Sequence, residues 1–227
     1  MIHKHDTADS LLDKLIAQGE HDQQDFKYKV MDAAKLARSV SAFANTRGGR
    51  LLIGVRDDGE VSGVTSEEEI FMMRTAAQRY CMPAVEVRFQ TVRCRGKNVV
   101  VCEVPESDHK PVYALEDIAI NHQTAVVTPV GERTAYIRIS DENIVASPVH
   151  LQIWREETAN RGMIVSFSEH EHAVIQALKD HPDDTLNHII RYSAVNRRKA
   201  ISILARLIRF GIAECNYVGK QFLFRLL

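Results

Sequence analysis

The sequence predicts a protein of the α+β class that is divided into two domains, and three observations lead to this. Its length of 227 residues fits one large domain or two small ones. Up to about residue 160, apolar residues recur at helical spacing in some segments and alternate at strand spacing in others. The remaining stretch has three helical patterns followed by a hairpin pattern. We therefore expect a mixed sheet-and-helix domain followed by a small, mostly helical one.

The first domain is predicted over residues 8–160. Its helix boundaries follow from capping patterns such as Ser66 with Glu69, and from Pro148, which suits the first turn of a helix. Helices are expected over residues 10–18, 30–44, 66–81 and 147–158. Strands are expected over residues 50–56, 60–64, 85–94, 99–104 and 134–139, with a tight turn at 57–59.

The second domain is predicted over residues 166–227, after a linker at 160–166. Asn196 is expected to cap its last helix and Gly211 to end it. Helices are expected over residues 168–178, 185–191 and 196–210, and hairpin strands over 212–215 and 221–225. Three helices and a hairpin within about sixty residues follow the plan of a winged helix-turn-helix domain.

Positive charge is concentrated near the end of the chain, although the net charge of the whole chain is only −1. From position 193 onward, seven Lys or Arg residues face a single acidic residue. Arg197, Arg198 and Lys199 fall in the first turn of the last helix, where cations oppose the helix dipole at a cost of about 0.3–1 kcal/mol each. A phosphate partner would offset that cost, and Lys220 in the hairpin turn could reach a neighbouring phosphate. Alternatively, these are solvated cations on a helix that forms only core or protein contacts.

Cysteine spacing and the first residues argue against several classes of protein. The four cysteines form no C-x-x-C pair, which disfavours a zinc site or a disulfide framework and favours a reducing, cytoplasmic location. The first residues lack the apolar core of a signal peptide, and no run approaches the ~20 apolar residues of a membrane span. A G-x-x-x-x-G-K-[ST] loop is missing as well, so ATP hydrolysis is not expected.

Asn45 and the pair Gly48-Gly49 mark a corner between a helix and a strand. Because glycine has no side chain, the backbone there could approach a partner closely, and its N–H groups could bind an anion. Lys27 could belong to a basic strip beside this corner. Alternatively, the glycines only allow the chain to turn tightly.

Three stretches of the chain resemble the Schlafen AlbA type-two family, over residues 8–150. They are Glu20-His-Asp-Gln-Gln-Asp25-Phe-Lys27, the segment from Ser41 to Gly63 that contains Ala42-Phe-Ala-Asn-Thr-Arg-Gly-Gly49, and Glu106-Ser-Asp-His-Lys110-Pro-Val-Tyr113 with Ala135-Tyr-Ile-Arg138 further on. The resemblance implies an AlbA-like sheet-and-helix domain that binds nucleic acid. It also implies that Lys110 lines the same groove as the glycine corner.

Schlafens that cleave RNA use acidic residues, and the resemblance places these at Glu20, Asp25 and Asp57. Three converging carboxylates could bind Mg²⁺ or Mn²⁺ and activate a water for phosphodiester hydrolysis. The chain departs from the family pattern at Asp25, where the family has the longer Glu. Alternatively, these residues form salt bridges and a turn, since Asp57-Asp58-Gly59 is an ordinary hairpin sequence.

These observations lead to one hypothesis and two alternatives. The first is a cytoplasmic, DNA-binding transcriptional regulator that forms a homodimer, prefers DNA to RNA and has no membrane contact. The nucleic-acid-binding residues are then expected to be Arg197, Arg198, Lys199, Lys220, Lys27, Lys110, Asn45, Gly48 and Gly49. One alternative is a Schlafen-like metal-dependent endoribonuclease that uses Glu20, Asp25 and Asp57 with Mg²⁺ or Mn²⁺. The other is a nucleotide- or ligand-binding module that controls a DNA-binding domain.

Overall fold

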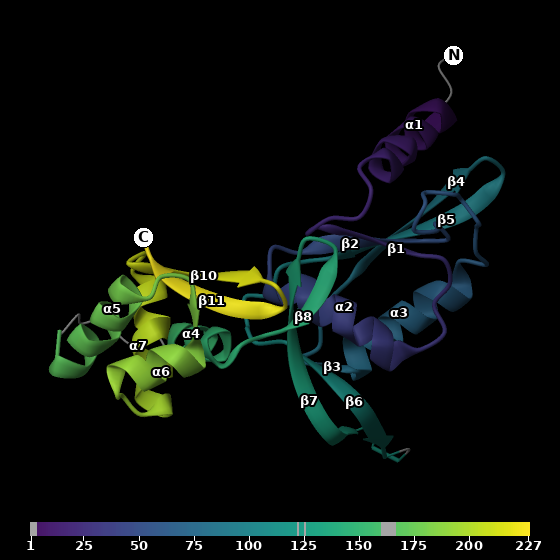
Figure 1. The fold of residues 1–227 in the computed structure, drawn as a ribbon. Helices are drawn as coiled ribbons and strands as arrows, with labels where there is room; N and C mark the ends of the chain where they lie inside the picture. Colours follow the sequence, from purple (N-terminus) through teal and green to yellow (C-terminus); the bar gives the residue numbers. More distant parts are fainter. Residues whose placement is uncertain (1–3, 122, 125, 160–166) are drawn as a thin grey trace. The chain divides into compact units, whose positions relative to one another are not determined.

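A computed structural model describes residues 4–121, 123–124, 126–159 and 167–227, and the chain folds into two compact units (Figure 1). The first unit is Met1–Val145 and the second is Ala146–Leu227. The predicted linker at 160–166 lies outside the described residues. Both units combine helices with strands, which confirms the α+β class.

The first unit is built from helices and two sheets. Its described helices are α1 (Lys4–Ala17), α2 (Ala33–Asn45) and α3 (Glu67–Arg79). Its described strands are β1 (Gln24–Lys27), β2 (Gly49–Ile53), β3 (Cys81–Met82), β4 (Arg88–Cys94), β5 (Lys97–Val104), β6 (Tyr113–Ile120), β7 (Val127–Ile139) and β8 (Glu142–Val145). One sheet has the strand order β1-β2-β5-β4 and the other has the order β3-β6-β7-β8.

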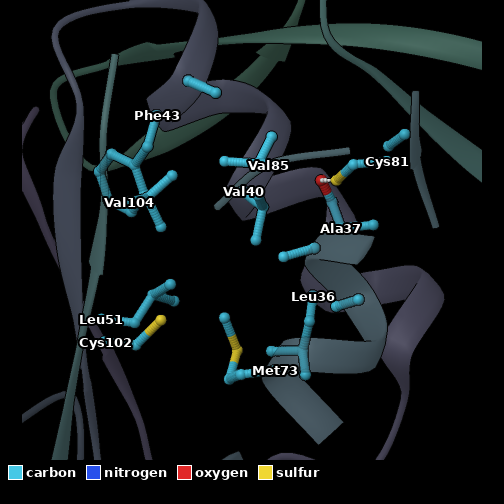
Figure 2. Packing of buried hydrophobic residues seen from close by; sticks show 14 of the residues in the cluster. Leu36, Ala37, Val40, Phe43, Leu51, Met73, Cys81, Val85, Cys102 and Val104 are labelled. Atoms are coloured by element: carbon cyan, nitrogen blue, oxygen red, sulfur yellow. Dashed lines mark hydrogen bonds between the residues drawn. The ribbon is translucent and has the colours of Figure 1, made fainter. Parts of the chain in front are cut away.

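Apolar side chains cover both faces of the first sheet. On one face, Phe43 of α2 and Met73 of α3 belong to a buried cluster with Leu51 of β2 (Figure 2). On the other face, Leu12 of α1 belongs to a second cluster with Leu52 of β2. Adjacent residues of β2 enter different clusters because successive side chains of a strand point to opposite faces. This packing fixes β2, and with it β1, which pairs with β2 in parallel.

Several elements of the first unit differ from the predicted boundaries: α1 begins earlier, at Lys4, β4 begins later, at Arg88, and the strand predicted over residues 60–64 is only an isolated bridge between Val55 and Val61. Helix α2 and strand β7 differ as well. Helix α2 begins at Ala33, three residues later than predicted, because Asp32 caps it by accepting a hydrogen bond from Lys35 N at 3.1 Å. Strand β7 begins at Val127, although a strand was predicted only from residue 134. Most of the added residues are exposed, so their sequence lacks the alternation that marks a half-buried strand.

The second unit combines helices with one small sheet. Its described helices are α4 (Pro148–Thr158), α5 (Glu169–Asp180), α6 (Leu186–Ser193) and α7 (Arg197–Arg209). Strands β9 (Asp184–Thr185), β10 (Ala213–Val218) and β11 (Gln221–Leu226) form a sheet of order β10-β11-β9. None of the described helices of the chain has the length and apolar character that a bilayer crossing requires.

Helix α4 belongs to the second unit, whereas the predicted boundary at residue 160 placed it in the first domain. Val149 lies in the core of the second unit, and Ile153 packs against that core. Trp154, the only tryptophan of the chain, is also buried. Glu156 forms an ion pair with Arg209 of α7 at 3.2 Å. The boundary was misplaced because helical spacing reveals an apolar face but not which neighbour covers it.

The cysteines are free thiols, and three of them are buried. Burial raises the pKa of the Cys81 and Cys102 thiols to about 12. Because the thiolate is the reactive form, these buried thiols are chemically inert at neutral pH. Their role is packing, as Figure 2 shows for Cys81 and Cys102.

Candidate functional site

The structure brings Glu20 and Asp25 together beside β1 and leaves Asp57 out of the group. Glu20 and Asp25 interact through their carboxyl groups, and Glu20 Oε1 also accepts a hydrogen bond from Phe26 N at 2.8 Å. Asp57 is exposed in the turn that follows β2. Within the described ranges, no three His, Cys, Asp or Glu side chains gather closely enough to hold a metal ion. The predicted three-carboxylate set is therefore not formed, and these residues do not fit a Mg²⁺ or Mn²⁺ site.

Asp25 is buried and already faces two cations. Arg138 lies 3.4 Å from one carboxylate oxygen of Asp25, and Lys27 Nζ lies 2.7 Å from the other. A buried carboxylate needs such compensation, because transfer of an isolated charge out of water is costly. Lys27 thus neutralises Asp25 inside the unit, although it was predicted to contact nucleic acid.

Arg138 of β7 is the centre of this charged network, and its side chain is almost fully buried. Its guanidinium donates to His21 O at 3.3 Å, to Gln24 O at 3.2 Å and to Asn143 Oδ1 at 3.0 Å. It therefore ties β7 to the segment that enters β1. Arg138 lies in one of the resembling stretches but had no predicted role. The sequence feature that could have indicated a buried role is that Arg138 is a single cation between Ile137 and Ile139 in a predicted strand.

Burial and the neighbouring Asp25 carboxylate raise the pKa of Glu20 above its ordinary value, against smaller opposing effects of the hydrogen bond from Phe26 N and of Lys27. Because the folded state binds this proton more tightly than the unfolded chain does, ionised Glu20 destabilises the fold above the unfolded pKa. Glu20→Gln is therefore expected to raise the stability at pH 7, and this gain should vanish below about pH 4. Urea denaturation at both pH values measures it. A loss of stability at pH 7 would show instead that the hydrogen bond from Phe26 N and the attraction to Lys27 dominate.

The glycine corner packs closely against its own chain. A Cβ atom on Gly49 would lie 2.4 Å from the ring of Phe43. Gly48 has a φ of +66°, and a Cβ atom there would lie 2.9 Å from Val104 O. These contacts are closer than any side chain tolerates, so both positions require glycine for packing and for the turn.

Asn45, which was predicted to contact nucleic acid, is buried and uses its whole amide group to bind the backbone of Val112, just before β6, and of Tyr136 in β7. Asn45 Nδ2 donates to Val112 O at 2.8 Å and to Tyr136 O at 2.9 Å, and Asn45 Oδ1 accepts from Val112 N at 2.7 Å. Ser41, one helical turn earlier, adds a bond from its Oγ to Val112 O at 2.8 Å. Thr46 Oγ1 accepts from Arg138 N at 2.9 Å. These three side chains attach the end of α2 to the second sheet.

Lys110 is likewise engaged within the first unit. Its Nζ donates to Thr46 O at 3.2 Å and to Glu106 Oε1 at 2.5 Å. A cation beside the last carbonyl groups of a helix is favourable, because the helix dipole is negative at that end. The contacts of Lys110 therefore explain its presence without a bound nucleic acid.

In the second unit, the predicted cations lie on the surface at the start of α7. Asn196 caps this helix as predicted, since its side chain accepts a hydrogen bond from Lys199 N at 3.0 Å. Arg197, Arg198 and Lys199 are exposed, and the first turn of α7 contains no acidic residue. Arg197 donates to Asn187 Oδ1 at 2.9 Å. Lys220 is exposed in the turn between β10 and β11.

Several solved structures are similar to this chain, and two of them show how far the similarity extends. The DIP2311 protein from Corynebacterium diphtheriae is 18% identical with a TM-score of 0.45, and the match covers 96% of this chain but only 38% of that one. The N-terminal domain of a RecG-related protein from Nitrosomonas europaea is 25% identical with a TM-score of 0.37, and the match covers 58% of this chain and 87% of that one.

No curated protein matches the sequence. The model of the family described as "Schlafen, AlbA_2" matches residues 20–147, which is more than half of the chain. All of the resembling stretches fall in this range. The protein therefore belongs to the Schlafen AlbA_2 family.

Proposed function

We propose that this protein binds nucleic acid, with double-stranded DNA preferred to RNA, and that it acts as a transcriptional regulator. The observation that carries the proposal is the set of exposed cations on the first turn of α7: Arg197, Arg198 and Lys199. No carboxylate lies within ion-pair distance of them in the described part of the chain.

A helix start is a poor place for uncompensated cations. The dipole makes that end positive, so each exposed cation there costs about 0.3–1 kcal/mol. The helix keeps three of them without an acidic neighbour in its first turn. A phosphate backbone would compensate both the side chains and the free N–H groups of the helix end.

The other elements of the second unit support its interpretation as a winged helix. Helix α6 precedes α7, and the β10–β11 hairpin follows it with Lys220 at its turn. In this type of domain the second helix of the motif enters the major groove and the hairpin contacts the backbone beside it. One such domain reads a half-site, so the proposal includes a homodimer.

The nuclease alternative has less support. Glu20 and Asp25 are adjacent, but Asp25 is neutralised by Arg138 and Lys27, and Asp57 lies in a separate turn. Of the cations predicted to bind nucleic acid, Lys27 and Lys110 are paired with carboxylates of the first unit, whereas those of the second unit remain open to a polyanion.

Removing the charges at the start of α7 is expected to flatten the salt dependence of duplex binding. For the triple variant Arg197→Gln, Arg198→Gln, Lys199→Gln, the slope of log affinity against log salt concentration should fall by about 0.9 for each phosphate that the protein no longer neutralises. This slope is measured by fluorescence anisotropy of a labelled DNA duplex at salt concentrations from about 50 to about 300 mM, which include the physiological concentration.

The matched control is the pair Lys179→Gln and Arg191→Gln, which removes exposed cations from α5 and α6. This control should leave the slope nearly unchanged. Equal affinity of the triple variant and the native protein at low salt would refute the site, and tighter binding of a structured RNA than of the duplex would refute the preference for DNA.

A further inference from the structure

Helices α4 and α7 lie side by side in the second unit (Figure 1). A groove of about 960 Å³ runs between them. Five arginines line it, three of which are Arg155, Arg197 and Arg198, while Glu156 is its single acidic lining residue. Its volume lies in the upper part of the range of small-molecule sites, which is roughly 300–1,000 Å³. The groove is therefore large enough for an organic ligand and strongly positive.

Two of the five arginines are already paired with carboxylates. Arg209 forms an ion pair with Glu156 at 3.2 Å, and both side chains are mostly buried. Arg206 forms an ion pair with Glu171 of α5. The first pair joins α7 to α4 and the second joins α7 to α5, so both guanidinium groups are already compensated.

The other three arginines have no acidic partner among the described residues. Arg155 donates to Gln152 Oε1 at 3.1 Å, and Arg197 donates to Asn187 Oδ1 at 2.9 Å, but both acceptors are neutral. Guanidinium groups bind phosphates and carboxylates through paired hydrogen bonds. Three uncompensated guanidinium groups along one groove are thus suited to a ligand with several negative charges.

Apolar side chains line the same groove. Leu151 of α4, Ile201 of α7 and Phe210, which follows α7, contribute to its surface. A bare inorganic anion would leave this surface exposed to water. A ligand with an anionic head and a planar or apolar body would instead contact both the arginines and the apolar residues.

We propose that the groove between α4 and α7 binds a small organic phosphate of the nucleoside phosphate class. Arg155, Arg197 and Arg198 bind its phosphate groups, and the apolar residues contact its ring. Because Arg197 and Arg198 also belong to the proposed DNA contact, the ligand and DNA compete for the protein. This competition rests on the proposed function, whereas binding of the ligand does not.

Calorimetric titration of the full chain with ATP, pyrophosphate and adenosine tests the proposal. ATP should bind at one site and more tightly than pyrophosphate or adenosine. Arg155→Ala should weaken ATP binding about tenfold, since it removes one charged hydrogen-bond partner. Lys199→Ala is the matched control, because Lys199 is an exposed cation near the groove but not part of its lining. It should weaken duplex DNA binding and leave ATP binding unchanged.

Three results would overturn the proposal. These are the absence of ATP binding, equal losses in the two variants, and ATP binding no tighter than that of pyrophosphate. Binding of a poly-glutamate peptide in place of ATP, with the same sensitivity to Arg155→Ala, would assign the groove to an acidic protein segment instead. If ATP binds as expected but does not displace DNA, the ligand site stands and the shared DNA contact is refuted.

Discussion

Replacing Arg138 with methionine is expected to lower the free energy of unfolding of the first unit by about 3–5 kcal/mol. The substitution leaves buried Asp25 with Lys27 as its remaining cation, and it removes the hydrogen bonds to His21 O and Gln24 O. A buried charge without its partner is far more costly than an unpaired charge at the surface. Urea denaturation followed by far-UV circular dichroism measures the effect.

The matched control is Arg93→Met, which removes an exposed arginine from β4 and should change the stability by less than about 0.5 kcal/mol. A double variant with Asp25→Asn isolates the coupling between the two side chains. The combined cost should be clearly smaller than the sum of the single costs. Additive costs would show that Arg138 and Asp25 do not act as a pair.

Asn45→Ala is expected to destabilise the first unit by about 2–4 kcal/mol, because it removes the acceptor of Val112 N and a donor to Tyr136 O. Val112 O keeps its bond from Ser41. Besides the loss of stability, the amide proton of Val112 should exchange with solvent much faster. Hydrogen exchange followed by NMR measures this proton directly.

Two variants separate the hydrogen bonds from the change in side-chain volume. Asn98→Ala removes an exposed asparagine from β5 and should change the stability by less than about 0.5 kcal/mol. Asn45→Asp keeps an acceptor for Val112 N but turns a second oxygen toward two carbonyl groups, so it should also destabilise the unit. Unchanged exchange of Val112 in Asn45→Ala would contradict the assigned bond.

Local patterns in the sequence predicted the local structure well. The cap at Asn196 is confirmed, as is the helix that follows it, because capping needs only residues that are close in the chain. The resemblance identified the family correctly, and the family match includes the glycine corner. The helix prediction and the family resemblance both depend on residues within short stretches of the sequence.

The partners of the polar residues could not be predicted in this way. Asp25 and Arg138 are 113 positions apart, and Asn45 and Val112 are 67 positions apart. The same residue types are used for binding nucleic acid and for joining two sheets, so the sequence alone could not show that Asn45 attaches α2 to the second sheet. The packing of α4 against α7 could not be predicted either. It brings Arg155 and Arg198 to the same groove, although they are 43 positions apart in the chain.

The position of Trp154 gives this protein a built-in optical probe that reports on one unit alone. Because the chain has no other tryptophan, its indole emission arises entirely from α4. The family domain contributes none of this signal. A thermal scan that records tryptophan emission together with ellipticity therefore distinguishes concerted melting of the two units from sequential melting, without any label or added mutation.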